Sequence, residues 1–263
     1  MCFDIKFVIA SQLKREKRLQ DMNPEASNIE LGEKHAGIKD LYHASAFTHP
    51  QILIFTNREP YKATPSTWGL IPNWVKDNNQ GLQLWNKTLN ARGETIFEKP
   101  SFRFAAKNKR CLIYLDGFYE HHHYKGKTYP FFIYRKDKEP MPVAGLWSEW
   151  TDKETGELLN TFSIVTTNGN ALMGRIHNNP KLLEPRMPVI IPDELRDAWL
   201  SPVRNEKDLA GIKHLIKPYQ DNVLTAHTVQ KLRGKNSLGN IPGVCDELIY
   251  DELAFDFIGL SNH

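Results

Sequence analysis

The chain lacks the features that define several classes of protein. It has only three cysteines, Cys2, Cys111 and Cys245, at irregular spacing, which excludes a disulfide framework and a zinc-finger pattern. No apolar run approaches the roughly 20 residues that span a bilayer, and the N-terminus has no charged segment followed by an apolar one, as a signal peptide requires. We therefore expect a soluble protein of a reducing compartment, the cytoplasm, without membrane contacts.

Charge of one sign is also not in large excess, because the formal net charge is +3. This excludes a histone-like polycation, but a local basic stripe could still contact a short piece of nucleic acid. The chain has 40% hydrophobic and 25% charged residues, as an ordinary globular protein does. It contains neither a Gly/Ser/Pro-rich linker nor an internal repeat. We predict one domain over residues 1–263, with a charged arm or helix around residues 11–40.

Short apolar runs rich in β-branched and aromatic residues dominate the middle of the chain and predict strands. The intervals between them are too short for a regular alternation of strand and crossover helix. We therefore predict an α+β fold with a mainly antiparallel, curved or barrel-like sheet flanked by helices. The predicted strands are QILIF at Gln51, CLIYLDGFYE at Cys111, YPFFIYR at Tyr129, PVAGLWSEW at Pro142, TFSIVTT at Thr161 and MPVIIP at Met187, and the predicted helices begin at Pro192 and near Asp208.

The residue after Met1 could carry two reactive groups. Methionine aminopeptidases generally remove Met1 when a small residue such as cysteine follows, and the mature chain would then begin at Cys2. Its α-amine and thiol both have ordinary pKa values within about two units of neutrality. An aldehyde can form a Schiff base with the amine, after which the thiol adds to the same carbon and closes a thiazolidine ring. An isolated Met-Cys start is more often accidental, with Met1 retained.

Polar blocks interrupt the strand-like runs at NARGET, LDGFYEHHH and RIHNN. Each has a plain structural interpretation: Asn90 suits a turn, Glu120 suits the surface end of a strand, and His177 suits a hydrogen-bonded position without chemistry. Along a strand, His121 and His123 share one face. Two histidines without a cysteine or acid at ligand spacing make a weak metal site, so we expect solvated histidines and no metal.

The motifs together indicate a family. They occur in the same order as in the SOS response-associated peptidase family, which the sequence therefore resembles, and whose members process abasic sites and crosslink to DNA through an N-terminal cysteine. The resemblance runs from Cys2 to about Pro192. The motifs are the Met-Cys start, STWGLIPNW at Ser66, NARGET at Asn90, LDGFYEH at Leu115, FSIVTTN at Phe162, and IH followed by RMPVII, with a weaker echo in LTAHTVQ at Leu224.

The resemblance implies a covalent abasic-site sensor with four catalytic residues. Cys2 would attack the open-chain aldehyde of an abasic site in single-stranded DNA and hold it as a crosslink. Asn90 matches an asparagine that hydrogen-bonds near the cysteine and the sugar, and Glu120 matches the catalytic glutamate that takes and returns protons. His177 matches a histidine suited to proton transfer at the sugar oxygen.

The resemblance also implies DNA contacts. Arg92 and Arg186 match arginines that clamp the phosphates beside the lesion, and Trp68 matches an aromatic near the DNA junction. Thr166 in the FSIVTTN motif and Pro50 in the segment YHASAFTHP are further candidates for DNA binding. The expected partner is single-stranded DNA that contains an abasic site. We expect no cofactor and a monomeric protein.

This chain departs from the family at its start. The family usually begins Cys-Gly-Arg, whereas Phe3 and Asp4 follow Cys2 here. An acid thus replaces an arginine that contacts phosphate, so Lys6 or another cation would have to substitute for it.

Two other functions stay open. A cysteine peptidase could use Cys2 as an acyl nucleophile, including on its own N-terminus, and would need a thiolate and a base but no free amine. A noncatalytic single-strand binder would need only Arg92, Trp68 and the charged arm, and its binding would be sensitive to salt but indifferent to the lesion.

Overall fold

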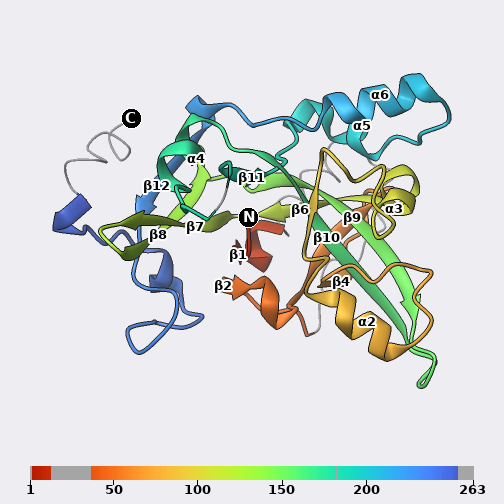
Figure 1. The fold of residues 1–263 in the computed structure, drawn as a ribbon, viewed down its shortest axis with the longest axis horizontal. Coiled ribbons are helices and arrows are strands. Elements are labelled where there is room, and N and C mark those ends of the chain that lie inside the picture. Colours follow the sequence, from red (N-terminus) through yellow and green to blue (C-terminus); the bar gives the residue numbers. More distant parts are fainter. Residues whose placement is uncertain (1, 13–36, 182, 254–263) are drawn as a thin grey trace.

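The computed structural model describes residues 2–12, 37–181 and 183–253, so the predicted charged arm lies almost entirely outside the described residues. Two β-sheets form the body of the protein. Figure 1 shows the first strand, β1, at the centre of the view, with β7 and β8 on one side and the long strands β9 and β10 on the other. The α+β class and the mainly antiparallel sheet are as predicted.

The seven-stranded sheet contains a closed ring. Strand β10 pairs with both β4 and β9, and the order β4-β3-β6-β9 completes the ring, so these strands form a barrel without free edges. Every pairing in the ring is antiparallel except that of β10 with β4. The strands of this sheet are β3 (Gln51–Thr56), β4 (Thr64–Trp68), β5 (Asn90–Arg92), β6 (Arg110–Leu115), β9 (Met141–Thr151), β10 (Leu158–Asn168) and β11 (Arg186–Pro188).

The five-stranded sheet has the order β12-β8-β7-β1-β2, and all its neighbours are antiparallel. The predicted run CLIYLDGFYE is divided between the two sheets at Asp116, whose carboxylate accepts a hydrogen bond from the Val8 amide at 2.7 Å. The first half of the run is therefore β6 of the barrel and the second half is β7. The strands of this sheet are β1 (Asp4–Phe7), β2 (Leu41–Ser45), β7 (Gly117–Tyr124), β8 (Lys127–Arg135) and β12 (Leu224–Thr228).

The described helices are short, and in three of them a side chain caps the N-terminus. Asp77, Asn170 and Asn205 each accept a hydrogen bond from the backbone amide three residues later, which satisfies a donor that the first turn leaves open. The helix predicted at Pro192 is broken into a 3-10 turn and a short α-helix. The helices are α2 (Asn78–Trp85), α3 (Arg103–Asn108), α4 (Ala171–Ile176), α5 (Arg196–Leu200) and α6 (Glu206–His214), and the 3-10 turns are η2 (Ala46–Thr48), η3 (Asp193–Leu195), η4 (Asp221–Val223), η5 (Pro242–Cys245) and η6 (Asp251–Leu253).

A buried arginine joins two helices to the barrel. Arg110 on β6 is fully buried, and its guanidinium donates to the main-chain oxygens of Ala106 at 2.7 Å, Lys107 at 2.8 Å and Trp199 at 2.8 Å. Burial lowers the pKa of Arg110 to about 10. Because carbonyl oxygens satisfy its donors, this charge stabilises the junction of α3 and α5 with β6 instead of opening a polar gap in the core.

Candidate active site beside the first strand

The first strand carries the start of the chain to the centre of the molecule. β1 lies between β2 and β7, and Asp4 pairs with Tyr119 of β7. Continuing this antiparallel register places Phe3 opposite Glu120 and Cys2 opposite the next residue of β7, His121. The side-chain amide of Asn90, from β5 of the other sheet, donates to the main-chain oxygen of Cys2 at 2.8 Å. Two residues predicted to act together, from positions 2 and 90, are therefore in contact.

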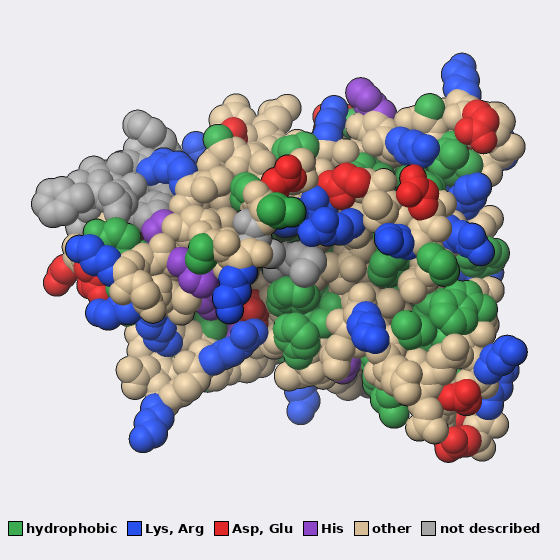
Figure 2. Space-filling model, viewed as in Figure 1, with side chains coloured by type: hydrophobic (Ala, Val, Ile, Leu, Met, Phe, Trp, Pro, Cys, Tyr) green, Lys and Arg blue, Asp and Glu red, His purple; other side chains and the backbone are tan. Residues whose placement is uncertain are grey.

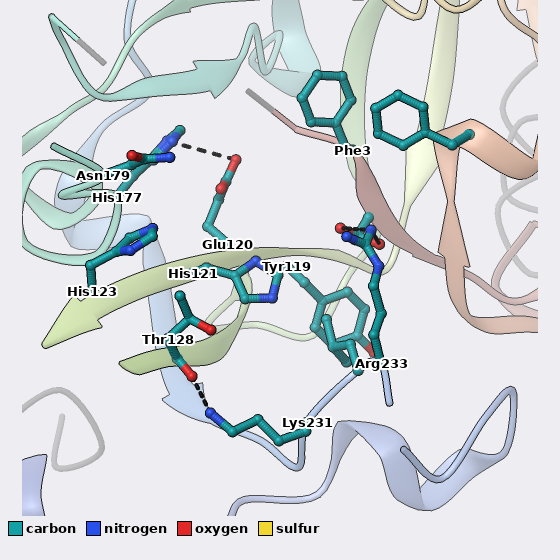
Figure 3. A pocket seen from close by; sticks show the side chains of 13 residues that line it. Phe3, Tyr119, Glu120, His121, His123, Thr128, His177, Asn179, Lys231 and Arg233 are labelled. Carbon is teal, nitrogen blue, oxygen red and sulfur yellow. Dashed lines mark hydrogen bonds and ion pairs between the residues drawn. The ribbon is translucent and has the colours of Figure 1, made fainter. Parts of the chain in front are cut away.

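Glu120 and His177 form the second contact of the site. Glu120 lies in the middle of β7, and His177 follows the last residue of α4, a helix whose Leu172, Met173 and Ile176 are buried. The Nδ1 atom of His177 lies 3.7 Å from Oε1 of Glu120, as Figure 3 shows. Helix α4 thus positions the histidine over the carboxylate.

Burial changes the proton affinity of both groups. Loss of solvent raises the pKa of Glu120 to about 7, and the charge of Asp4 adds to this rise. Loss of solvent lowers the pKa of His177 to about 4. At neutral pH the carboxyl group is thus divided between its two protonation states and the imidazole is neutral, so the carboxyl group can give or take a proton and the imidazole has a free lone pair that can accept one.

The tautomer of His177 follows from its main-chain neighbour. Its Nδ1 atom lies 3.2 Å from the carbonyl oxygen of Arg186, which can only accept, and 3.4 Å from the amide nitrogen of the same residue. We assign the proton to Nδ1 from the shorter contact, which leaves Nε2 as the basic nitrogen of the ring.

The thiol of Cys2 is also perturbed. Cys2 is fully buried, and its Sγ atom lies 4.0 Å from the main-chain oxygen of Asp4. Burial raises the pKa of the thiol well above its usual value, and the negative charge of Glu120 raises it further. The thiol is therefore protonated at neutral pH and needs a base before it can react.

A cleft of about 440 Å³ adjoins these groups. It is polar at its centre, where Glu120 and His177 contribute, and it has aromatic and cationic residues at its margins. Figure 3 shows Phe3 and Lys231 at opposite sides of the cleft. The lining residues are Phe3, Asp4, Phe47, Tyr119, Glu120, His121, His123, Thr128, His177, Asn179, Lys231, Leu232 and Arg233.

Asp4, the acid that departs from the family pattern, forms an ion pair with Arg233, a residue near the other end of the chain. Asp4 is buried, and its carboxylate accepts hydrogen bonds from Nη2 of Arg233 at 2.8 and 2.9 Å and lies 2.9 Å from Nε2 of His43. The sequence suggested that Lys6 or another cation substitutes for the missing arginine. The amine of Lys6 lies over the rings of Tyr42 and Phe132, whereas Arg233 lines the cleft, so the substitution stays a prediction for which Arg233 is a candidate. The sequence analysis did not name Arg233, although this residue follows shortly after the weakly matching LTAHTVQ motif.

A second polar cluster lies where β5, β10 and β11 meet. Thr166 pairs with Arg92 in the sheet. The guanidinium of Arg186 donates to both carboxylate oxygens of Glu94 at 2.7 and 2.9 Å, to Asn168 at 2.8 Å and to the main-chain oxygen of Thr166 at 3.0 Å. Burial alone would raise the pKa of Glu94, but the bonds from Arg186 hold it below its usual value.

The contacts in this cluster bear on the expectation that Arg186, Thr166 and Arg92 bind DNA. Arg186 and Thr166 are buried, at 4% and 0% exposure, so in this structure Arg186 binds Glu94 and not a phosphate. Arg92 is exposed on the same edge but does not line the cleft. DNA contacts by Arg92, and by Arg186 after Glu94 gives way, stay predictions.

The position of Trp68 in this structure does not support a DNA contact near the lesion, and that contact stays a prediction. The side chain of Trp68 is fully buried, packs 5.9 Å from the ring of Phe162, and donates from Nε1 to the main-chain oxygen of Leu89 at 2.7 Å. Burial inside the barrel leaves no face for a base. Pro50 is half-buried at the start of β3, where its carbonyl oxygen accepts from the Trp68 amide at 3.1 Å, and its DNA contact stays a prediction.

The run of histidines lies along the cleft. His121 and His123 line it, whereas His122 is buried with its Nδ1 atom 3.1 Å from the carbonyl oxygen of Arg175. Among the described residues, no group of three or more His, Cys, Asp or Glu side chains could hold a metal ion.

Figure 2 shows Lys, Arg and His side chains gathered on the part of this face that carries β7 and β8.

None of the described helices is long and apolar enough to cross a membrane.

Comparison with known proteins identifies the family. The profile described as "SOS response associated peptidase (SRAP)" matches residues 4–235. The chain belongs to this family. It is 40% identical over 166 residues to the abasic site processing protein YoqW of Bacillus subtilis, a match that covers 63% of this chain and 68% of that protein. It is 30% identical over 202 residues to the abasic site processing protein YMR114C of Saccharomyces cerevisiae, covering 76% of this chain and 52% of that protein.

Solved structures share the SRAP fold. A protein of Bacteroides thetaiotaomicron superposes with a TM-score of 0.80 at 32% identity, covering 94% of this chain and 100% of that chain. A protein of Bordetella bronchiseptica superposes with a TM-score of 0.66 at 23% identity, covering 87% of this chain and 99% of that chain. The second likeness concerns the fold alone.

Proposed function

We propose that this SRAP protein, after removal of Met1, captures abasic sites in single-stranded DNA as a thiazolidine on Cys2. The observation that carries the proposal is that four distant segments form two contacts beside one cleft, which Glu120, His177 and the neighbour of Cys2, Phe3, line. Asn90 binds the main chain of Cys2 at 2.8 Å, and Glu120 lies 3.7 Å from His177. The relatives are named abasic site processing proteins, which supports the same substrate here.

The reaction first needs an open sugar. An abasic deoxyribose is mostly a cyclic hemiacetal, which opens when a proton leaves its 1′-hydroxyl and another reaches the ring oxygen, so that the C1′–O4′ bond breaks and an aldehyde forms. The neutral imidazole of His177 has a basic Nε2 for this transfer. The carboxyl group of Glu120, with its pKa of about 7, can supply or remove the second proton.

The amine and thiol of Cys2 then act in turn. The amine adds to the aldehyde carbon, and the carbinolamine loses one water as protonated Glu120 gives its proton to the leaving hydroxyl. The iminium that remains keeps its N–H proton. The thiol gives its proton to the ionised carboxylate of Glu120, and the sulfur adds to the iminium carbon, which closes the ring with a neutral nitrogen. The net change is the loss of one water, with no oxidant or reductant. A base beside the sulfur is needed because burial raises the thiol pKa.

Recognition of a site without a base has to come from the backbone and from the pocket. Arg233 and Lys231 are cations that line the cleft, and Arg92 is exposed nearby on β5. Such contacts carry no information about base identity, so we propose that binding depends little on sequence.

The direct test is the intact mass of the purified protein before and after incubation with an oligonucleotide that carries one abasic site. We expect loss of Met1 and a heat-stable increase equal to the oligonucleotide minus one water. The matched control oligonucleotide carries tetrahydrofuran, an abasic analogue without an aldehyde, and should give no adduct. If the processed protein gives no heat-stable adduct, the proposed function is wrong.

Peptidase activity is a second candidate, because the family is described as a peptidase family and the strand that follows Cys2 pairs with β7, which carries the Glu120 carboxyl group in contact with His177. The two reactions differ in their need for the amine. Acetylation of the α-amine should abolish the DNA adduct, because no imine can form, but should spare acyl transfer to the thiol. An acetylated protein that still forms the heat-stable adduct would contradict the thiazolidine.

A further inference from the structure

An aromatic pair stands next to the reactive residue. Phe3 follows Cys2 directly, and its ring centroid lies 5.0 Å from that of Phe47 at an interplanar angle of 36°. Both residues line the cleft. Phe47 is 52% exposed, although a large apolar side chain in a soluble protein is usually covered. The covalent reaction uses neither ring, so the pair calls for another explanation.

Main-chain bonds hold this pair in place. The amide of Ala46 donates to the carbonyl oxygen of Phe3 at 2.7 Å, and Ala46 itself is fully buried. Phe47 follows in the η2 turn, which ends at His49 with a φ of 49° and a hydrogen bond from its amide to Ala46. The buried residue anchors the turn, so Phe47 projects at its outer side. These main-chain bonds connect the segments that carry Phe3 and Phe47, whose rings lie together at the margin of the cleft.

Cations face this surface. Arg233 has a side-chain exposure of 58% while Asp4 holds one of its nitrogens, and Lys231 lies across the cleft from Phe3 in Figure 3. Figure 2 shows hydrophobic side chains gathered near β1 and β2, beside the Lys and Arg side chains. Aromatic rings beside cations are how proteins hold single-stranded nucleic acid, because bases stack on the rings while the backbone lies along the charges.

We propose that Phe3 and Phe47 form the platform on which the nucleobase next to the abasic site stacks. This inference rests on the proposed function, since it presumes that single-stranded DNA enters the cleft with its bare sugar at Cys2. Every base has a π-face, so the platform accepts any base at that position but requires that a base be there. It assigns to this pair an aromatic contact for which Trp68, buried in this structure, offers no face.

The test removes the base and the ring separately and together. The oligonucleotides carry a central tetrahydrofuran, which cannot react, and either keep both flanking bases or replace the 5′ or the 3′ neighbour with a second tetrahydrofuran. Affinity is measured by fluorescence anisotropy for the wild type, Phe47→Leu and Phe3→Leu. Phe104→Leu is the matched control, because Phe104 is 47% exposed on α3 and does not line the cleft.

We expect the loss of one particular flanking base to weaken wild-type binding on the order of tenfold. Phe47→Leu should weaken binding to the oligonucleotide with both bases by a similar factor, and for this variant the same base should no longer matter. Phe47→Trp should restore both effects, which also shows that the variants fold. Phe104→Leu should behave as the wild type.

The proposal is overturned if Phe47→Leu and the wild type respond equally to loss of either flanking base, or if Phe104→Leu weakens binding as much as Phe47→Leu. These outcomes are independent of the covalent reaction, because tetrahydrofuran has no aldehyde. A wild type that shows the flanking-base effect but no adduct with a true abasic site would contradict the proposed crosslink and leave the platform in place.

Discussion

The residues on two sides of the cleft differ in their exposure to solvent. Glu120 and His177 are each 6% exposed, and removal from water moves their pKa values toward and below neutrality. Phe47 is 52% exposed, and the side chain of Arg233 is 58% exposed. Groups that exchange protons need burial because a low dielectric tunes them. Groups that hold a long ligand must face solvent, because the ligand arrives from there.

This contrast predicts different consequences for changes on each side. Changes on the buried side should alter the rate and the chemistry of capture at nearly constant affinity. Changes on the exposed side should alter affinity and salt dependence while the bound complex still reacts.

The largest effect is expected for Cys2→Ser. The serine variant keeps the terminal amine but lacks the thiol, so the stable adduct should disappear while an imine that borohydride traps persists. The measurement is denaturing gel electrophoresis with and without borohydride. Cys245→Ser is the matched control, because Cys245 is a free cysteine that does not line the cleft. A serine variant that crosslinks as stably as the parent would remove the thiol from the mechanism.

A smaller loss is expected for Glu120→Gln. A positioned acid–base group typically contributes about 10²- to 10⁴-fold to a rate, so the single-turnover rate of capture should fall by that order. The wild-type rate should decline as pH rises above about 7, where Glu120 loses its proton. The glutamine variant should lack this decline. Equal pH profiles for the two proteins would argue against proton transfer by Glu120.

Arg233→Ala should change affinity and not chemistry. Loss of one phosphate contact with a single strand should lower the slope of log K against log salt by about 0.7, and the affinity should fall several-fold at low salt. The rate at saturating DNA should stay unchanged. The control is Arg58→Ala, because Arg58 forms an exposed ion pair with Glu149 and does not line the cleft. A salt slope that stays at the wild-type value would exclude a phosphate contact by Arg233.

The smallest effect concerns the pH dependence of stability. The folded-state pKa of Glu120 is raised from 4.5 to about 7, so its contribution is fully present below about pH 4.5 and is lost as pH rises through about 7. The pKa of His177 is lowered from 6.5 to about 4, so its contribution is present above pH 6.5 and is lost as pH falls through about 4. Between pH 5 and pH 8 the two contributions change in opposite directions, so they partly cancel in the wild type. Urea unfolding should therefore show that the stability at pH 8 relative to pH 5 is higher for Glu120→Gln than for the wild type.

The strands predicted at Gln51 and Tyr129 were confirmed as β3 and β8, in which nearly all of the apolar residues are buried. The run CLIYLDGFYE was predicted as one strand, but it serves both sheets, because Asp116 bonds to Val8 and turns the chain there. The strand predicted at Met187 was too long, since only Arg186–Pro188 pairs with β10. Local residue preference does not report which sheet a strand joins.

The site could be predicted in part for a similar reason. Asn90, Glu120 and His177 stand in short motifs whose order is specific, so they could be named before the fold was known. Phe47 and Arg233 stand in segments without such motifs. Their place in the cleft depends on the pairing of β1 with β2 and on the return of the chain after β12.

The sequence by itself determined the family and the strand-rich α+β class, and it named the candidate reactive groups, because these depend on residue types and their order. Only the tertiary structure decided which groups are buried and which are exposed. It placed Trp68 in the barrel and the Phe3–Phe47 pair in the cleft. The physical reason is that solvation, and with it every pKa shift and every contact available to a ligand, depends on neighbours that are remote along the chain.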